Sequence, residues 1–138
     1  MTNPAAMAGA SGMKDGEALA GAVREQARAK VNLTLHVLGK RPDGYHELDS
    51  LVVFADLCDE LRFRPATASS VTLDGPFGEA IDGENLILKA ARAVSGWLGR
   101  EIHGDFRLTK NIPVAAGVGG GSSDAAAAIR ILLRAVLR

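Results

Sequence analysis

The clearest pattern in the chain is an alternation of apolar and polar side chains that starts at residue 27. Every second position from Ala27 to Val37 is apolar, and the positions between them, from Arg28 to His36, are polar. A period of two is typical of a β-strand with one buried side. The pattern therefore predicts a long strand over residues 27–37 whose apolar face is buried.

Further apolar segments, separated by turn residues, also have the character of strands. Pro42 followed by Asp43 and Gly44 marks a turn directly after the first strand. The predicted strands that follow lie within LDSLVVFADL (48–57), ELRFRPA (60–66), SSVTLDG (69–75) and GDFRLTKNIP (104–113).

The period changes to that of a helix in ENLILKAARAVSGWLG, residues 84–99. Apolar side chains recur there at helical spacing, and this phase places Trp97 in the predicted core. Asn85 is the predicted N-cap, and Gly99 is the predicted end. A second helix is predicted from Ser123 onward, with an apolar face made of Ile131, Leu132, Val136 and Leu137.

The order of these elements indicates the fold class. Several strands come first, and then a helix, a strand and a second helix. A doubly wound parallel sheet would place a helix after each strand, so the order favours an α+β fold.

Length and composition narrow the possible functions. The 138 residues suit one domain, and 47% hydrophobic residues suffice for a buried core. Sixteen basic residues balance sixteen acidic ones, which argues against a nucleic-acid partner bound mainly through phosphates. The single cysteine, Cys58, fits a reducing compartment such as the cytoplasm and a small buried side chain. No apolar run reaches the roughly 18 residues of a membrane helix.

Residues 1–26 are rich in alanine and glycine and lack a large apolar block. Lys14, Asp15 and Glu17 interrupt the segment, so it is a poor secretory signal. We interpret residues 1–26 as a disordered N-terminal tail with one short helix near residues 17–26.

The segment PVAAGVGGGSSDAAAAIR, residues 113–130, is the strongest functional signal. A glycine-rich turn between a strand and a helix is a common phosphate-binding arrangement, because the helix N-terminus carries unpaired amides and partial positive charge. Glycines let an anion approach those amides closely. Ser122 and Ser123 are candidates to cap the helix or to donate hydroxyl groups to phosphate.

Two common phosphate loops do not match this segment. A Walker A loop needs a Gly-Lys pair before Ser or Thr, and no lysine lies between Lys110 and Arg130. The dinucleotide fingerprint that would begin at Gly117 and Gly119 has Ser122 where its third glycine belongs. A flexible hinge before a helix therefore stays open as the alternative to phosphate binding.

The same residues resemble the phosphate loop of the GHMP kinase superfamily, which has the form Pro-x-x-x-Gly-(Leu or Val)-Gly-x-x-Ser-Ser. With ARAKVNLTLHVLGKRPDGYHELDSLVVFADLCDEL, residues 27–61, the loop is similar to one branch of that superfamily. That branch phosphorylates the 2-hydroxyl of a cytidine diphosphate-linked methylerythritol in the non-mevalonate isoprenoid pathway. The resemblance implies the N-terminal GHMP kinase domain, whose fold is shared with a ribosomal protein domain.

The resemblance also implies cofactors and site residues. ATP and Mg²⁺ would be used, Lys30 would be the catalytic lysine, and Asn32, Tyr45 and His46 would contact the substrate. Tyr45 would stack on the cytosine, and His46 would form a hydrogen bond with it. The ATP phosphates would be wrapped by Pro113, Val114, Ala115, Ala116, Gly117, Val118, Gly119, Gly120, Gly121, Ser122 and Ser123.

The residues by themselves allow plainer interpretations. Lys30 and Asn32 are two positions apart on the predicted strand, so they share a face, but that face can simply be solvated. Thr34 and His36 share the face and receive no role. Asp124 is interpreted as an acid that favours the helix dipole, with a Mg²⁺ ligand as the alternative.

The resemblance covers residues 27–138 and the front part of the family only. The catalytic aspartate and the C-terminal domain are expected downstream of residue 138. Two functional hypotheses follow: a kinase represented by its N-terminal part, or an inactive or non-catalytic nucleotide-binding module. A third, an RNA-binding domain, is disfavoured by the zero net charge.

Overall fold

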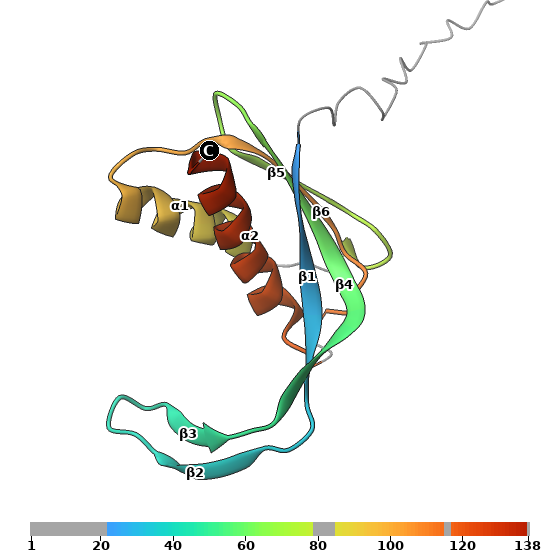
Figure 1. Ribbon diagram of the computed structural model, residues 1–138, viewed down its shortest axis with the longest axis vertical. Coiled ribbons are helices and arrows are strands. Elements are labelled where there is room, and N and C mark those ends of the chain that lie inside the picture. Colours follow the sequence, from blue (N-terminus) through green and yellow to red (C-terminus); the bar gives the residue numbers. More distant parts are fainter. Residues whose placement is uncertain (1–21, 79–84, 115–116, 138) are drawn as a thin grey trace, which may run out of the picture.

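The computed structural model describes residues 22–78, 85–114 and 117–137. Its main sheet has four strands in the order β1-β4-β6-β5, and a separate hairpin pairs β2 with β3 (Figure 1). All pairs are antiparallel except β5 with β6, which are parallel. The elements are β1 (Val23–Asn32), β2 (His36–Lys40), β3 (His46–Asp49), β4 (Val52–Pro65), β5 (Ser70–Asp74), α1 (Leu86–Leu98), β6 (Gly104–Thr109) and α2 (Gly120–Val136).

The strand predicted over residues 27–37 is in fact two strands. β1 begins at Val23 and ends at Asn32, and β2 begins at His36. The helix predicted near residues 17–26 is therefore wrong over residues 23–26, while residues 17–21 lie outside the described part of the chain.

The two segments predicted as separate strands at 48–57 and 60–66 are joined for most of their length in β4, because β4 has partners on both sides of the register shift in its pairing with β1. Its first part pairs with β1 from Asn32 back to Arg28, and its last part pairs with both β1 and β6. The strands predicted at 69–75 and 104–113 are confirmed as β5 and β6.

Helices α1 and α2 pack on one face of the sheet and enclose the core (Figure 1). Small residues meet where α2 crosses β1: Ala27 on the strand and Ala127 and Ala128 on the helix are fully buried in one cluster. Without larger side chains between them, helix and strand approach closely, which sets the N-terminus of α2 against the end of β1. The rest of the core comes from Leu61, Phe63, Ile87, Ala90, Ala91, Val94, Phe106, Leu108, Ile131 and Leu132.

The boundaries predicted for α1 are confirmed. The side-chain oxygen of Asn85 accepts a hydrogen bond from the Ile87 amide at 2.9 Å, and Gly99 ends the helix with a φ of 65°. The core position predicted for Trp97 is wrong, because its side chain is 77% exposed. Trp97 lies at the margin of the buried stripe centred on Ile87 and Val94.

The end of α2 agrees with the predicted apolar face only in part. Ile131 and Leu132 are fully buried, Val136 is half-buried, and Leu137 is 77% exposed. The middle of α2 is therefore buried in the core, whereas the end of the helix lies beyond the core.

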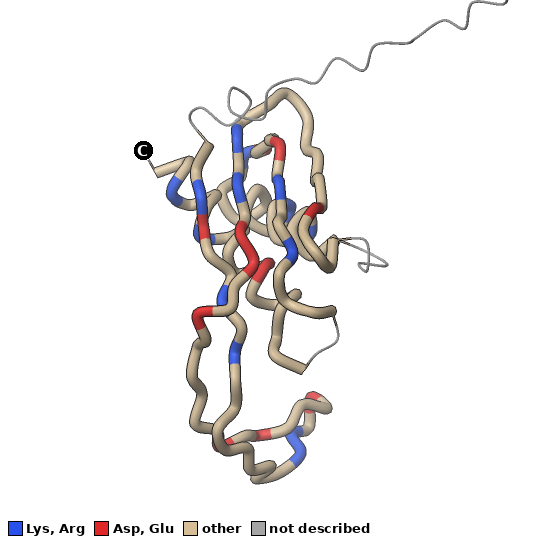
Figure 2. Tube along the Cα trace, turned by 90° about the vertical axis from the view of Figure 1, so that its right-hand side faces the viewer, with Lys and Arg blue, Asp and Glu red and all other residues tan. Residues whose placement is uncertain are grey.

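Residues 31–57 form a projection that we call the arm: the β2–β3 hairpin with the adjoining ends of β1 and β4. The rest of the described chain is the body. The arm bends away from the sheet and passes below the N-terminal end of α2 (Figures 1 and 2). The apolar face predicted to be buried is exposed here, with Leu33, Leu35 and Val37 each more than half exposed. Neither helix packs over this part of the strands (Figure 1).

Charged residues of both signs lie close together along the body strands (Figure 2). Arg107 pairs with Asp74 at 2.6 Å, and Arg64 pairs with Asp105 at 3.0 Å. Hydrogen bonds from Ser70 and Arg64 lower the pKa of Asp105. For Asp74, burial would raise the pKa, but hydrogen bonds from Thr109 and Arg107 outweigh burial and lower it. The charges on this sheet are thus largely neutralised in pairs.

Candidate active site

The glycine-rich segment forms the N-terminus of α2. The helix begins at Gly120, not at Ser123, and its N-cap is Gly119 with a φ of 70°. Ser122 and Ser123 therefore lie within the first turn, and the capping role predicted for them is wrong: the cap has no side-chain hydrogen bond. The first intrahelical bond runs from the Ser123 amide to the Gly119 carbonyl at 2.9 Å. By helix geometry, the three amides before Ser123 have no acceptor within the helix and are available to an anion.

The glycines at this turn are required for different reasons. Gly119 has a left-handed backbone conformation that other residues rarely adopt. A Cβ on Gly120 would lie 3.1 Å from Nζ of Lys110 and 3.3 Å from Ile112, and a Cβ on Gly121 would lie 3.3 Å from Leu86. At Gly120 and Gly121 the backbone thus approaches its neighbours closely.

Of the remaining predicted loop residues, Pro113 and Val114 are exposed at its start, and Gly117 has a φ of 73°. Ala115 and Ala116 lie outside the described residues. Val118 makes the contact that joins the loop to β1.

Lys30 meets this loop directly. Its backbone amide donates to the Val118 carbonyl at 2.8 Å, and its Cε would lie 3.7 Å from a Cβ on Gly119. A second bond, from the Ser123 hydroxyl to the Arg28 carbonyl at 2.8 Å, fastens the first turn of α2 to the same strand. The pairing of β1 with β4 shifts register between Arg28 and Lys30, so the ladder is irregular where the strand meets the loop.

The side chains of Lys30 and Asn32 are neighbours, as their shared strand face predicts. Nζ of Lys30 donates to Oδ1 of Asn32 at 3.0 Å. The structure thus brings the proposed catalytic lysine and one proposed substrate contact to the glycine loop, which lies far from both in the sequence.

Tyr45 and His46 are placed elsewhere, at the turn of the arm. Tyr45 is 75% exposed, and its amide donates to Oδ1 of Asp43 at 3.1 Å. His46 is exposed and pairs with Lys40 in the hairpin. The hairpin turn therefore presents an aromatic ring and an imidazole to solvent, apart from Lys30.

A buried cluster of three charged side chains, Lys110, Asp59 and Asp124, lies beside the glycine loop. None of the three is among the predicted site residues. Lys110 donates to Oδ2 of Asp124 at 2.8 Å and also to Oδ2 of Asp59. Oδ1 of Asp59 accepts from the amides of Asn111 and Ile112 at 2.6 and 2.8 Å. Lys110 and Asp124 stand at the two ends of the glycine loop, so their ion pair fixes its span.

The alternation of buried and exposed positions along the strands could have identified two members of this cluster from the sequence. Asp59 is in phase with the buried Leu61 and Phe63 of β4, and Lys110 is in phase with the buried Phe106 and Leu108 of β6. A charged residue on the apolar phase of a strand needs a buried partner.

The cluster changes the interpretation of Asp124. Its residue is 3% exposed, and its Oδ1 is buried without a hydrogen-bond partner. Burial raises the pKa of Asp124 to about 6, despite the opposing effect of Lys110. Burial would lower the pKa of Lys110, but the hydrogen bonds that it donates to Asp124 and Asp59 raise it above its ordinary value. Asp124 is thus a buried partner of Lys110, not an exposed acid at the helix end.

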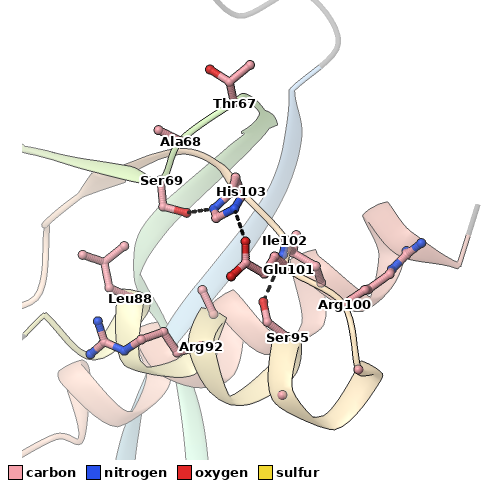
Figure 3. A pocket seen from close by; sticks show the side chains of 13 residues that line it. Thr67, Ala68, Ser69, Leu88, Arg92, Ser95, Arg100, Glu101, Ile102 and His103 are labelled. Carbon is pink, nitrogen blue, oxygen red and sulfur yellow. Dashed lines mark hydrogen bonds and ion pairs between the residues drawn. The ribbon is translucent and has the colours of Figure 1, made fainter.

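A cavity of about 780 Å³ lies at the other end of β6, between α1 and the β4–β5 and α1–β6 connections (Figure 3). Leu88 and Ile102 contribute apolar walls, and Arg92 lies at its edge. The His103 ring lies 3.0 Å from Oε2 of Glu101 and 3.5 Å from the Ser69 hydroxyl. None of the predicted site residues lines this cavity.

Within residues 22–78, 85–114 and 117–137, no group of three or more His, Cys, Asp or Glu side chains could hold a metal ion. None of the helices in this described part of the chain combines the length and apolar character needed to cross a bilayer.

The sequence of this chain matches a known protein family and several curated relatives. Residues 85–137 match the family described as GHMP kinases N terminal domain. A curated relative from Rhodopseudomonas palustris, named 4-diphosphocytidyl-2-C-methyl-D-erythritol kinase, is 53% identical over 125 residues, which are 89% of this chain and 41% of the relative. One of the same name from Paramagnetospirillum magneticum is 58% identical over 110 residues, or 79% and 39% of the two chains.

Solved structures also match this chain in fold. A crystal structure titled as 4-(cytidine 5'-diphospho)-2C-methyl-D-erythritol kinase matches with a TM-score of 0.64 and 40% identity, covering 82% of this chain and 40% of that one. Mevalonate pyrophosphate decarboxylase from Streptococcus pyogenes, at 14% identity and a TM-score of 0.60, covers 83% and 37% and shares the fold alone. This chain spans about 40% of the length of the curated relatives it matches. The expected α+β fold of the GHMP kinase N-terminal domain is confirmed.

Proposed function

From the premise that this chain belongs to the GHMP kinases and matches the N-terminal part of the 4-diphosphocytidyl-2-C-methyl-D-erythritol kinases, we propose that it forms the ATP-binding part of such an enzyme. Residues 27–138 would belong to the N-terminal domain. The enzyme would transfer the γ-phosphoryl group of ATP to the 2-hydroxyl of 4-diphosphocytidyl-2-C-methyl-D-erythritol. One observation supports the proposal most directly: the Lys30 amide donates to the Val118 carbonyl, so Lys30 lies beside the glycine turn that we propose binds phosphate.

In this proposal the loop and Lys30 have complementary tasks. The free amides at the start of α2 hold the ATP phosphates. The ammonium group of Lys30, beside Gly119, stabilises the negative charge that develops as the phosphoryl group moves. The new bond forms between the substrate oxygen and the γ-phosphorus, and the bond to the bridging oxygen of ADP breaks. We expect the hydroxyl proton to pass to an aspartate in the part of the relatives that follows the matched segment.

Mg²⁺ accompanies ATP in this proposal, and the polar side chains near the turn differ in how well they fit it. Asp124 does not fit, because its carboxylate is buried and paired with Lys110. The Ser123 hydroxyl is engaged with the Arg28 carbonyl. The exposed Ser122 in the first turn is the side chain that fits, together with phosphate oxygens and water.

The arm would bind the cytidine end of the acceptor. An exposed tyrosine offers a face on which a base can stack, and the neighbouring His46 can form a hydrogen bond with the base edge. Asn32, beside Lys30, would contact the part of the substrate nearer the reacting hydroxyl. Catalysis would take place in the cytoplasm, which the single half-buried cysteine fits.

A non-catalytic nucleotide-binding module is the second candidate, because the free amides at the start of α2 can bind phosphate without any phosphoryl transfer. A chimera separates the two. This chain would replace the matching segment of the Rhodopseudomonas palustris relative, and ADP release would be measured with and without the cytidyl substrate. We expect substrate-dependent ADP release from the chimera and little from the 138-residue chain alone. A folded chimera that binds ATP but never phosphorylates the substrate would contradict the kinase proposal.

A further inference from the structure

Within the arm, the connection between β1 and β2 is hydrogen-bonded to the connection between β3 and β4. The Leu33 amide donates to the Leu51 carbonyl at 2.7 Å, and the Leu51 amide donates to Oγ1 of Thr34 at 3.0 Å. The Ser50 hydroxyl donates to the Thr34 carbonyl at 2.6 Å. We call these four residues, Leu33, Thr34, Ser50 and Leu51, the joint. Each of these bonds links the β1–β2 connection to the β3–β4 connection.

The joint also reaches the catalytic lysine through one side chain. The Ser50 hydroxyl lies 3.2 Å from Oδ1 of Asn32, and the same oxygen accepts from Nζ of Lys30 at 3.0 Å. Nζ of Lys30 is a donor, and the single hydrogen of the Ser50 hydroxyl is shared between the Thr34 carbonyl and Oδ1. The amide oxygen of Asn32 therefore faces both groups, and its NH₂ group faces the other way. The orientation of the Asn32 amide is thus determined by Lys30 on one side and by the joint on the other.

The joint has no large part in holding the core together. Thr34 is exposed, Ser50 is half-buried, and the flanking Leu33 and Leu51 are 57% and 58% exposed. A hydrogen bond that competes with water at such sites contributes only about 0.5–1.5 kcal/mol to folding stability. What these bonds can determine is direction: the line along which the arm leaves β1 and β4, and the orientation of Asn32.

We propose that Ser50 and Thr34 are positioning residues for the acceptor substrate: they orient the Asn32 amide beside Lys30 and fix the direction of the arm that carries Tyr45 and His46. The group that Asn32 meets on the substrate must then be a hydrogen-bond acceptor, because the NH₂ group is the part of the amide left to bind it. The inference rests on the proposed function and names two further residues for it.

The inference predicts a split between the two substrates. ATP is held at the start of α2, which is fastened to β1 through Val118 and Ser123, so changes in the joint leave its binding intact. The acceptor depends on Asn32 and on the arm. Loss of the Ser50 hydroxyl therefore weakens acceptor binding selectively.

The test compares Ser50→Ala, Ser50→Thr and Thr34→Val in the chimera, with Ser70→Ala as the matched control. Ser70 also donates its hydroxyl to a neighbour, Asp105 at 2.7 Å, but on a body strand away from the joint. We expect Ser50→Ala and Thr34→Val to raise KM for the cytidyl substrate about tenfold, the effect of one lost hydrogen bond, with KM for ATP unchanged. Ser50→Thr keeps the hydroxyl and restores the wild-type value. Equal changes in both KM values, or none in either, would overturn the inference.

A second measurement tests the inference if the wild-type chimera is inactive, in which case the proposed function fails by itself. In the ¹⁵N-labelled 138-residue chain, Ser50→Ala is expected to shift the side-chain NH₂ signals of Asn32 and the backbone amides of residues 36–49. The signals of α2 stay in place. Unchanged Asn32 and arm signals would overturn the positioning role whatever the enzyme does.

Discussion

β4 runs through both the body and the arm, and its two phenylalanines meet opposite surroundings. Phe63, in the body, is 1% exposed and packs against Phe106 with ring centroids 4.8 Å apart, whereas Phe54, in the arm, is 66% exposed. Both lie on the same strand, Phe63 opposite Val23 and Phe54 opposite Lys30. The difference arises because α1 and α2 cover the body end of the sheet and leave the arm uncovered (Figure 1). A strand pattern thus tells which residues share a face, while packing decides whether that face is buried.

The two regions also differ in the chemistry that they carry. The body holds the glycine turn, Lys30 and the buried cluster around Lys110, all fixed by short contacts. The arm holds Tyr45 and His46 on an exposed hairpin. We therefore expect changes in the body to alter stability and ATP use, and changes in the arm to alter acceptor binding.

The largest expected effect is a difference in stability along β4. Phe63→Ala should lower the free energy of unfolding by about 3–5 kcal/mol, because it leaves a cavity in a buried aromatic cluster. Phe54→Ala should change it by less than about 0.5 kcal/mol. Denaturant unfolding of the 138-residue chain measures both. If the two substitutions cost the same, the distinction between body and arm would be wrong.

The next largest effect concerns turnover in the chimera. Lys30→Ala should lower kcat by about 100-fold to 1,000-fold while ATP affinity changes little, because its ammonium group acts on the charge of the moving phosphoryl group. Lys89→Ala, an exposed lysine of α1, is the matched control and should leave kcat within twofold, roughly the scatter of a surface change. Near-normal turnover of the Lys30 variant would remove the catalytic role proposed for it.

Two glycine substitutions, one in the body and one in the arm, test whether ATP binding depends on the loop. Gly119→Ala places a Cβ on a residue with a φ of 70°, which costs about 1–2 kcal/mol and should raise the ATP dissociation constant about tenfold. Gly39→Ala in the arm has nothing within 4 Å of its new Cβ and should leave ATP binding unchanged. Calorimetric titration gives both constants. Equal affinities in the two variants would argue against the loop as the phosphate site.

The smallest expected effect is a pH dependence that comes from the buried cluster. Burial raises the pKa of Asp124 from 3.8 to about 6, so the folded chain retains a proton that the unfolded chain releases, and stability falls as pH rises through this range. Lys110 and Asp59 are the charged groups that face it.

Asp124→Asn mimics the protonated form, so its stability relative to wild type should rise with pH across that window by on the order of 1 kcal/mol. Thermal unfolding of both chains between pH 4 and pH 7 measures the difference. Parallel curves for the two chains would show that Asp124 does not titrate there.

Local rules predicted the parts of the fold that depend on local chemistry. The cap at Asn85, the helix end at Gly99, the strands β5 and β6 and the α+β class all follow from spacing and from residue type. Lys30, Asn32 and the glycine loop could be singled out from motifs, and the structure brings these three together.

What sequence reasoning missed depends on contacts between distant segments. The end of β1 at Asn32, the exposure of Trp97 and the apolar surface of the arm depend on how far the two helices reach over the sheet. The start of α2 at Gly120 depends on glycine backbone that local preference would assign to a turn. The pairing of Lys110 with Asp59 and Asp124 joins two strands and a helix that no local pattern connects, although strand phase marks two of its members.

The central claim, that body and arm bind different parts of the reactants, is tested most directly by NMR titration of the ¹⁵N-labelled chain. ATP with Mg²⁺ should shift the backbone amides of residues 117–123 and of Lys30, and cytidine diphosphate should shift those of residues 36–49. The account predicts two separate sets of shifted signals, one for each ligand. ATP that moves only arm signals, or leaves residues 117–123 unperturbed at saturation, would contradict it.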